Sequence, residues 1–105
     1  MPDATASPFG PAALGTVAAT LFTTAAGPTV TQIISVDVTN TSALPITFRL
    51  SEGADAAGKR LFDTMIAGNG KLESTTVRTL AASTAIQGYG SLTGLTCKVT
   101  TVIST

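Results

Sequence analysis

Apolar and polar side chains alternate along residues 30–38 more regularly than anywhere else in the chain. The apolar side chains on even positions are Val30, Ile34, Val36 and Val38. A period of two residues puts successive side chains on opposite faces of an extended backbone, so it predicts a half-buried β-strand. Two residues depart from the pattern, because polar Gln32 falls on the apolar face and Ile33 on the polar face.

Shorter runs of the same kind, separated by turn-forming residues, predict six further strands. They cover residues 17–24, 46–51, 61–66, 71–80, 86–91 and 95–103. Asn69-Gly70 predicts a hairpin turn between the fourth and fifth strands, because such turns need residues that tolerate positive φ. The chain is therefore expected to be all-β, a single antiparallel β-sandwich of the jelly-roll or immunoglobulin-like type with about seven to eight strands.

Residues 1–16 are rich in Ala, Pro, Gly, Ser and Thr and lack this alternation. The prolines of this segment are Pro2, Pro8 and Pro11. Proline excludes a helix interior or a central strand, so we expect an extended N-terminal arm here and a β-sandwich domain over residues 17–105. The arm either lies on a neighbouring subunit, with Phe9 and Leu14 as anchors, or is a disordered tail.

The low content of charged residues indicates a domain that is assembled with other subunits, not one that is free in solution. Charged residues make up 11% of the chain and apolar ones 44%, and six basic residues cancel six acidic ones. Soluble domains usually carry about 25% charged residues, so we expect other subunits to cover part of this surface. The alternative is a compact monomer kept in solution by hydroxyl groups, since threonine alone occupies 20 positions. A neutral chain has no electrostatic footprint for nucleic acid or an anionic membrane.

Residues 53–59 nearly spell a phosphate-binding loop, in which two glycines separated by four residues precede a lysine. Such a loop needs Ser or Thr after the lysine to hold magnesium, and a helix starting there whose N–H groups face the phosphates. Arg60 stands at that position, and a predicted strand follows. We therefore interpret the segment as a strand-to-strand loop, with Lys59 and Arg60 at a solvated or subunit-facing rim.

Side chains suited to catalysis or metal binding do not form a recognisable set. Histidine is absent, so serine and threonine lack their usual activating base. Asp37, Asp63 and Glu73 could be proposed as paired carboxylates, but each lies among hydroxyl residues on a predicted strand, which indicates a solvated face. Cys97 is the only cysteine and is expected to be a small core residue. We expect no catalytic residue, no cofactor and no metal, and so no enzyme.

Several short motifs occur along residues 17–105, namely Leu21-Phe22-Thr23, Val36-Asp37-Val38-Thr39-Asn40, Thr47-Phe48-Arg49-Leu50 and Ile66-Ala67-Gly68-Asn69-Gly70. This layout resembles that of a group of short virion structural proteins from tailed bacteriophages. The motifs follow strands and turns and include no active-site signature. The resemblance implies a β-sandwich subunit of the phage particle, either a capsid decoration (cement) protein or a piece of the tail or its fibres.

The expected function is that of a capsid decoration protein, which binds the outer shell of the virion and stabilises contacts between capsomers. Its expected partners are the major capsid protein and copies of itself, as a trimer or in repeated copies, with no nucleic acid, membrane or small-molecule substrate. The residues expected at subunit or capsid contacts are Pro8, Phe9, Pro11, Leu14, Lys59 and Arg60. Two alternatives stay open: a tail or tail-fibre component that contacts the host surface, and a carbohydrate-binding β-sandwich module. The absence of Trp and the single Tyr argue against the module, because few rings could stack on sugars.

Overall fold

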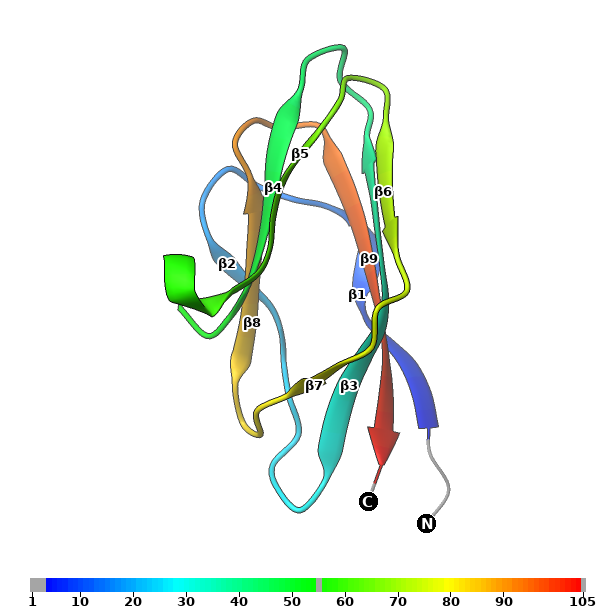
Figure 1. The fold of residues 1–105 in the computed structure, drawn as a ribbon, viewed down its shortest axis with the longest axis vertical. Helices are drawn as coiled ribbons and strands as arrows, with labels where there is room; N and C mark the ends of the chain where they lie inside the picture. Colours follow the sequence, from blue (N-terminus) through cyan, green and yellow to red (C-terminus); the bar gives the residue numbers. More distant parts are fainter. Residues whose placement is uncertain (1–3, 55, 105) are drawn as a thin grey trace.

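Two antiparallel β-sheets lie face to face in the computed structural model, which describes residues 4–54 and 56–104 (Figure 1). The strands are β1 (Ala4–Ala13), β2 (Ala19–Thr23), β3 (Val30–Asn40), β4 (Ile46–Glu52), β5 (Arg60–Ile66), β6 (Lys71–Ser74), β7 (Arg78–Leu80), β8 (Ala85–Gly90) and β9 (Leu95–Ser104). A 3-10 helix, η1 (Ala57–Lys59), lies between β4 and β5. Sheet A has the order β1-β9-β3-β6, with β7 also paired to β3, and sheet B has the order β2-β8-β4-β5. The all-β sandwich predicted from the sequence is confirmed.

The strand order is that of one long hairpin that has been rolled up. β4 pairs with β5 next to the bend, and the pairs β3 with β6 and β7, β2 with β8, and β1 with β9 follow outward. Successive pairs fall alternately in sheet B and sheet A. This is the topology of a jelly roll, so it decides between the two sandwich types that the sequence left open.

The described residues form nine strands, more than the seven or eight expected. One addition arises because the predicted strand 71–80 is divided into β6 and β7, which pair with different parts of β3. Val77, in the interruption, is 57% exposed. The other addition is β1, which comes from the segment that was expected to be an arm.

Apolar side chains from the inner faces of both sheets fill the space between them. Phe48 is completely buried, and its ring lies 5.9 Å, centroid to centroid, from that of Phe62. The other buried apolar residues are Leu14, Ile33, Val36, Val38, Ile46, Leu50, Ile66, Leu80, Ile86, Leu95, Cys97 and Val99. Because a strand turns successive side chains to opposite faces, most strands supply every second residue to this core.

A β-bulge in β3 explains the two residues that break the alternation. Where β3 pairs with β9, it advances two residues while β9 advances one, so Ile34 is an extra residue. An extra residue reverses the face on which the following side chains lie. Ile33 is therefore buried and Val30 exposed, and even positions reach the core only from Val36 onward. The prediction that Val30 and Ile34 share the core face is wrong for this reason.

The turn at Asn69-Gly70 joins the two sheets and does not close a hairpin. Asn69 has a φ of 57°, and the N–H of Gly70 donates to the carbonyl of Ala67 at 2.9 Å, which closes a tight turn. β5 before the turn belongs to sheet B and β6 after it belongs to sheet A. The predicted turn is present, but the predicted hairpin is not, because the chain crosses here so that both strands can face the core.

The N-terminal segment is extended, as expected, but it is not separate from the sandwich. Ala4–Ala13 forms β1, an edge strand that pairs with β9 along its length. Its register shifts on both sides of Phe9, next to Pro8 and Pro11, which lack the N–H that a regular ladder needs. The expected boundary between arm and domain is therefore corrected, since β1 belongs to sheet A. Residues 1–3 of the expected arm lie outside the described residues.

Candidate functional site

Four connections between strands lie toward one end of the sandwich, the upper end in Figure 1, where the connection from β1 to β2 is set lower than the other three. They are residues 14–18, 41–45, 67–70 and 91–94, and we call this surface the loop end. Antiparallel strands reverse direction at each connection, so every second connection of the rolled hairpin falls at the same end. Segments far apart in the sequence are thereby brought to one surface.

Main-chain hydrogen bonds join three of these connections to one another and tie the fourth, residues 14–18, to the end of β8. The bonds, of 2.8 to 3.0 Å, run from the N–H groups of Thr41, Asn69 and Gly90 to the carbonyl oxygens of Gly94, Ser42 and Gly15, respectively. Each of them links a different pair of neighbouring segments. Gly68 packs so closely on Ala43 that a side-chain carbon at Gly68 would overlap the carbonyl oxygen of Ala43. The backbone of the loop end is therefore held in one arrangement.

Asn40, the last residue of β3, supports the loop end with a fully buried side chain. Its amide nitrogen donates to the carbonyl of Leu44 at 2.7 Å and lies 3.1 and 3.2 Å from the carbonyl oxygens of Ile66 and Ala67. Its amide oxygen accepts a hydrogen bond from the N–H of Ser42 at 2.9 Å. A buried amide with both ends satisfied fixes two connections relative to each other.

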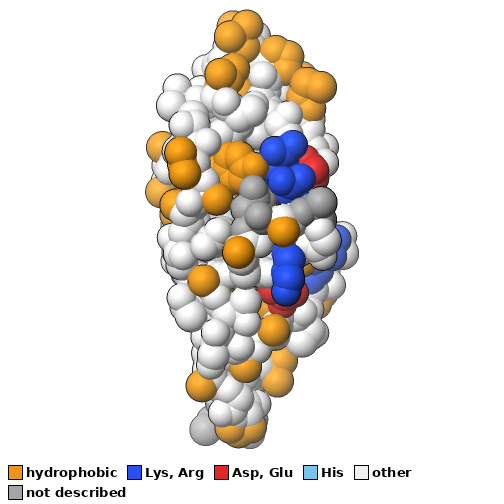
Figure 2. Space-filling model, turned by 90° about the vertical axis from the view of Figure 1, so that its left-hand side faces the viewer, with side chains coloured by type: hydrophobic (Ala, Val, Ile, Leu, Met, Phe, Trp, Pro, Cys, Tyr) orange, Lys and Arg blue, Asp and Glu red, His pale blue; other side chains and the backbone are white. Residues whose placement is uncertain are grey.

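The outer surface of the loop end is uncharged and exposes large apolar side chains among hydroxyl and amide groups. None of its residues is Asp, Glu, Lys or Arg. Its large exposed side chains are Val17, Leu44 and Leu92, which are 76%, 58% and 44% exposed, and Met65, near the end of β5, is 66% exposed. Figure 2 shows hydrophobic side chains gathered at this upper end, above the charged groups on the face of sheet B. Exposed apolar patches on small domains are candidates for interaction surfaces, so the loop end is the candidate site of this chain.

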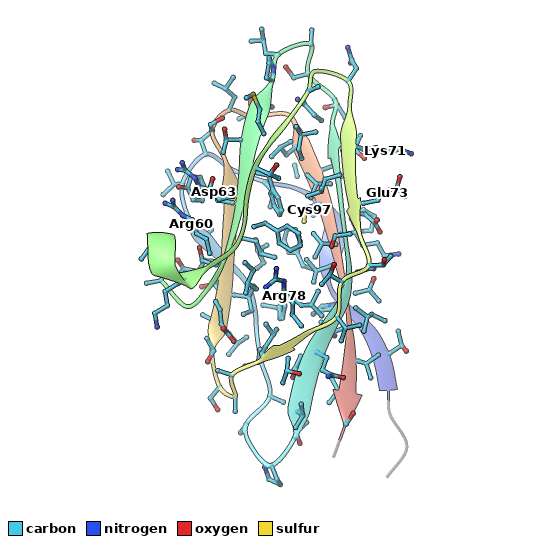
Figure 3. All side chains as sticks on the ribbon, in the orientation of Figure 1. Arg60, Asp63, Lys71, Glu73, Arg78 and Cys97 are labelled. Atoms are coloured by element: carbon cyan, nitrogen blue, oxygen red, sulfur yellow. The ribbon has the colours of Figure 1, made fainter. Side chains whose placement is uncertain are left out.

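The outer face of sheet B carries a group of charged side chains, some of them labelled in Figure 3. Arg49 on β4 lies between its cross-strand neighbours, Asp63 on β5 and Tyr89 on β8. Its Nε donates to Oδ1 of Asp63 at 3.0 Å and its Nη1 donates to the hydroxyl of Tyr89 at 3.0 Å. Arg60 Nη1 donates to the other carboxylate oxygen of Asp63 at 3.2 Å. These bonds tie β4, β5 and β8 together.

Hydrogen bonds within this group also set its ionisation. The hydrogen bond from Arg49 holds the pKa of Asp63 below its usual range, and the charges of Arg49 and Arg60 lower it further. The hydrogen bond with Tyr89, and then the one with Asp63, raises the pKa of Arg49. A carboxylate that stays ionised and is neutralised by two guanidinium groups is a poor general base. The group therefore has the character of a structural ion-pair network.

The apolar residues predicted to contact a neighbour contribute to this chain's own core. Phe9 is half-buried and packs against the core from β1, and Leu14 is buried just beyond the end of that strand. Pro8 and Pro11, by contrast, are exposed on β1. The predicted contact residues of the N-terminal segment are thus divided between the inside and the outside of the molecule.

The segment that resembles a phosphate-binding loop is the connection between β4 and β5, as predicted. Among the described residues of this connection, Ala57–Lys59 turn in η1, and Arg60 begins β5 where a phosphate-binding loop would begin a helix. Lys59 is exposed, whereas Arg60 is half-buried and paired with Asp63. β5 and β1 lie at opposite edges of the sandwich, so the structure does not bring Lys59 and Arg60 together with the N-terminal residues.

The other ionisable side chains of the described residues do not form a second candidate site. Within residues 4–54 and 56–104, no group of three or more His, Cys, Asp or Glu is placed to hold a metal ion. A shallow hollow on sheet A includes Lys71 and Glu73, which pair at 3.6 Å.

Burial, with a further effect of Asp37, raises the pKa of the Cys97 thiol to about 12. In the part of the chain that the structure describes, no helix is long and apolar enough to cross a membrane.

Comparison with known proteins gives no relative from which a function could be proposed. No family model matches the sequence, and the searches of curated proteins and of solved structures found no significant match. The function is therefore proposed from the loop end and the distribution of charge.

Val17, Leu44 and Leu92 are not among the residues predicted to make contacts. A signal for two of them is present, because a large aliphatic residue stands within each of the short turns Ala43-Leu44-Pro45 and Ser91-Leu92-Thr93, where small or polar residues are usual. Their proximity depends on the jelly-roll topology, which no single turn reveals.

Proposed function

We propose that this chain is a non-enzymatic structural protein that works by joining other proteins. The observation that carries the proposal is the distribution of charge. Residues 4–36, which include β1, β2 and the first part of β3, contain no Asp, Glu, Lys or Arg, and neither does the loop end. A surface without charge that exposes large apolar side chains is stabilised when another protein covers it.

The edges of both sheets are protected against strand addition, so faces and ends are left for assembly. β1 has two prolines and two register shifts, and β2 and β5 each pair with a register shift, beside Leu21 and Leu61. β6 and β7 are short and carry Lys71, Glu73 and Arg78. Prolines, bulges, charges and short strands are the features that prevent sheets from pairing edge to edge.

Within this class we propose a capsid decoration (cement) protein on the outer shell of a bacteriophage virion. The support is the resemblance of residues 17–105 to short virion proteins of tailed bacteriophages. The jelly-roll topology is common among viral capsid domains, although a fold alone does not specify a function. The proposed partners are the major capsid protein and copies of this chain, as a trimer or in repeated copies. Repetition on a lattice lets individually weak contacts hold a subunit in place.

The copy number per particle tests this proposal. Quantitative mass spectrometry of purified particles would compare the amount of this chain with that of the major capsid protein. Decoration predicts copies on the order of hundreds, because every repeat of the shell offers a site. A copy number of about a dozen or fewer, as expected for a component present once per tail ring, would assign the chain to the tail or its fibres. Absence from the particle would overturn the proposal altogether.

The alternative of a carbohydrate-binding module draws no support from the tyrosine. Tyr89 is half-buried, its hydroxyl accepts a hydrogen bond from Arg49, and the guanidinium carbon of Arg49 lies 5.9 Å from the centre of its ring. An aromatic ring that stacks on a sugar needs an open face. Binding of the purified chain to a glycan panel would revive this alternative.

A further inference from the structure

We propose that the loop end is the base on which the subunit stands, and that its partner is an uncharged, apolar patch on a protein surface that repeats, as the shell of a particle does. This inference rests on the proposed function and deepens it by naming the docking surface. Its starting point is the placement of Leu44, Leu92 and Val17 on one end of the sandwich, each exposed and none beside a charged residue in its own connection.

The rigidity of the loop end favours binding. The hydrogen bonds from Thr41 to Gly94 and from Asn69 to Ser42 hold neighbouring connections at 2.8 Å, and the buried Asn40 holds them from below. A surface whose backbone is already ordered loses little conformational entropy when it is covered. The apolar side chains are therefore displayed on a support that does not have to rearrange.

The charge of the loop end defines the chemistry of the partner. Its four connections have no ionisable side chain, and the first charged residue after them, Lys71, is paired with Glu73 at 3.6 Å. Phosphate groups of nucleic acids or lipids find no cation there. A partner charge buried against this surface would lose its hydration without gaining a counter-charge, so the matching patch is uncharged. The exposed side chains of Val17, Leu44 and Leu92 favour apolar groups opposite them.

The size of the loop end favours a repeating partner over a single stable pair. The molecule extends 45 Å along its longest axis and 24 × 19 Å across it, so the loop end has a cross-section on the order of 450 Å², which is smaller than the about 800 Å² that each partner contributes to a standard stable interface. Two copies joined loop end to loop end would separate readily. On a lattice, contacts between neighbouring copies add to the contact below each of them.

This placement gives the subunit a definite orientation. The strands run along the longest axis, so the sandwich stands upright on the loop end, with η1 and the Arg60–Asp63 pair on its side (Figures 1 and 3). Charged side chains then face solvent or neighbouring copies.

A co-sedimentation experiment with matched variants tests the inference. Particles from a phage in which the gene for this chain is deleted would be mixed with the purified full-length chain. Leu44→Asp and Leu92→Asp place a charge in the loop end, and Val77→Asp is the control, because Val77 is 57% exposed and Leu44 58% exposed. We expect the apparent Kd to rise at least about tenfold for the loop-end variants and less than about twofold for the control. Wild-type binding should change little between about 0.05 and 0.5 M salt, because no charge pair is involved.

The outcomes separate this inference from the function on which it rests. If the wild type does not bind the particles, both are overturned. If the wild type binds and both loop-end variants bind equally well, the decoration function stands and the loop end is not the base. Sedimentation velocity of the chain alone provides a second control. A loss of self-association in Leu44→Asp with unchanged particle binding would assign the surface to a second copy and overturn the inference. Circular dichroism verifies that each variant folds.

Discussion

The buried side-chain amide of Asn40 donates a hydrogen bond across 3.1 Å to the main-chain oxygen of Ile66, and so joins the end of a strand in sheet A to the end of a strand in sheet B. The same nitrogen reaches the carbonyl of Leu44, and the amide oxygen accepts from Ser42. One side chain thus connects both sheets with the loop end.

Asn40→Ala should lower the free energy of unfolding by about 2–4 kcal/mol, because buried carbonyl groups lose their donor. Asn40→Asp has nearly the same shape but presents acceptors to three carbonyl oxygens, so it should be at least as damaging as the alanine variant. Urea denaturation measures both. Thr41→Val is the control, because it removes an exposed hydrogen bond to Gly94 and should cost less than about 1 kcal/mol. Equal stability of Asn40→Ala and the wild type would contradict the role assigned to this amide.

Gly68→Ala should destabilise the fold by about 1–3 kcal/mol, because the added carbon overlaps the main-chain oxygen of Ala43 and one connection must move. Gly15→Ala is the matched control on the same surface, since a side-chain carbon there meets nothing within 4 Å. Thermal unfolding of the two variants should therefore differ clearly. Similar melting temperatures would show that residues 41–45 and 67–70 are not packed as described.

Phe9→Ala should lower the free energy of unfolding by about 1–3 kcal/mol, because this side chain packs against the core from β1. Pro8→Ala, at the exposed neighbouring position, should change it by less than about 0.5 kcal/mol. Denaturation of the isolated chain distinguishes the two cases. A neutral Phe9→Ala in the isolated chain would restore the interpretation of the segment as an arm that reaches a neighbour.

Asp63→Asn should destabilise the chain at neutral pH and make no difference in strong acid. A carboxyl group whose pKa is lower in the folded than in the unfolded chain stabilises the fold fully above the unfolded value of about 3.9. That stabilisation is lost as the pH falls through the lowered folded value. Urea midpoints of the wild type and the variant should therefore differ at pH 7 and converge near pH 2. A gap of the same size at both pH values would mean that ionisation of Asp63 is irrelevant.

Cys97 should react with a thiol reagent only when the protein opens. Burial raises the pKa of its thiol to about 12, and the thiolate is the reactive form. At pH 8 the labelling rate should be low in buffer and rise with the unfolded fraction in urea. A Cys97→Ala/Thr93→Cys variant, which carries its thiol on the exposed β8–β9 connection, should be labelled rapidly without urea. Rapid labelling of Cys97 in the native protein would place it outside the core.

Strands could be predicted from the sequence because their signal is local. The alternation that ends in Val36 and Val38 requires only neighbouring residues, and the predicted strand 95–103 agrees with β9 to within one residue. The bulge at Ile34 could not be predicted, because it is defined by pairing with β9 at the other end of the chain. The crossing between sheets at Asn69 could not be predicted for the same reason. A tight turn can have the same sequence whether its two flanking strands pair with each other or belong to different sheets.

The candidate site depended still more on long-range pairing. An apolar residue in a proline-rich segment has the same sequence signature whether it faces its own core or a neighbour, and only the pairing of β1 with β9 places Phe9 inside. Leu44 and Leu92 are far apart in the sequence. They share a surface because the rolled hairpin returns both connections to the same end.

The position of β9 in sheet A determines when the domain can complete its fold during synthesis. β9 leaves the ribosome after all the other strands, yet it lies between β1 and β3 and pairs with both. Until it is synthesised, β1 has no partner in its sheet and one side of β3 is open. The domain therefore completes its fold only after translation has passed β9, and pairing of such distant segments is intrinsically slow. A nascent chain that stalls before β9 presents open strands to its surroundings and is a target for chaperones or proteases.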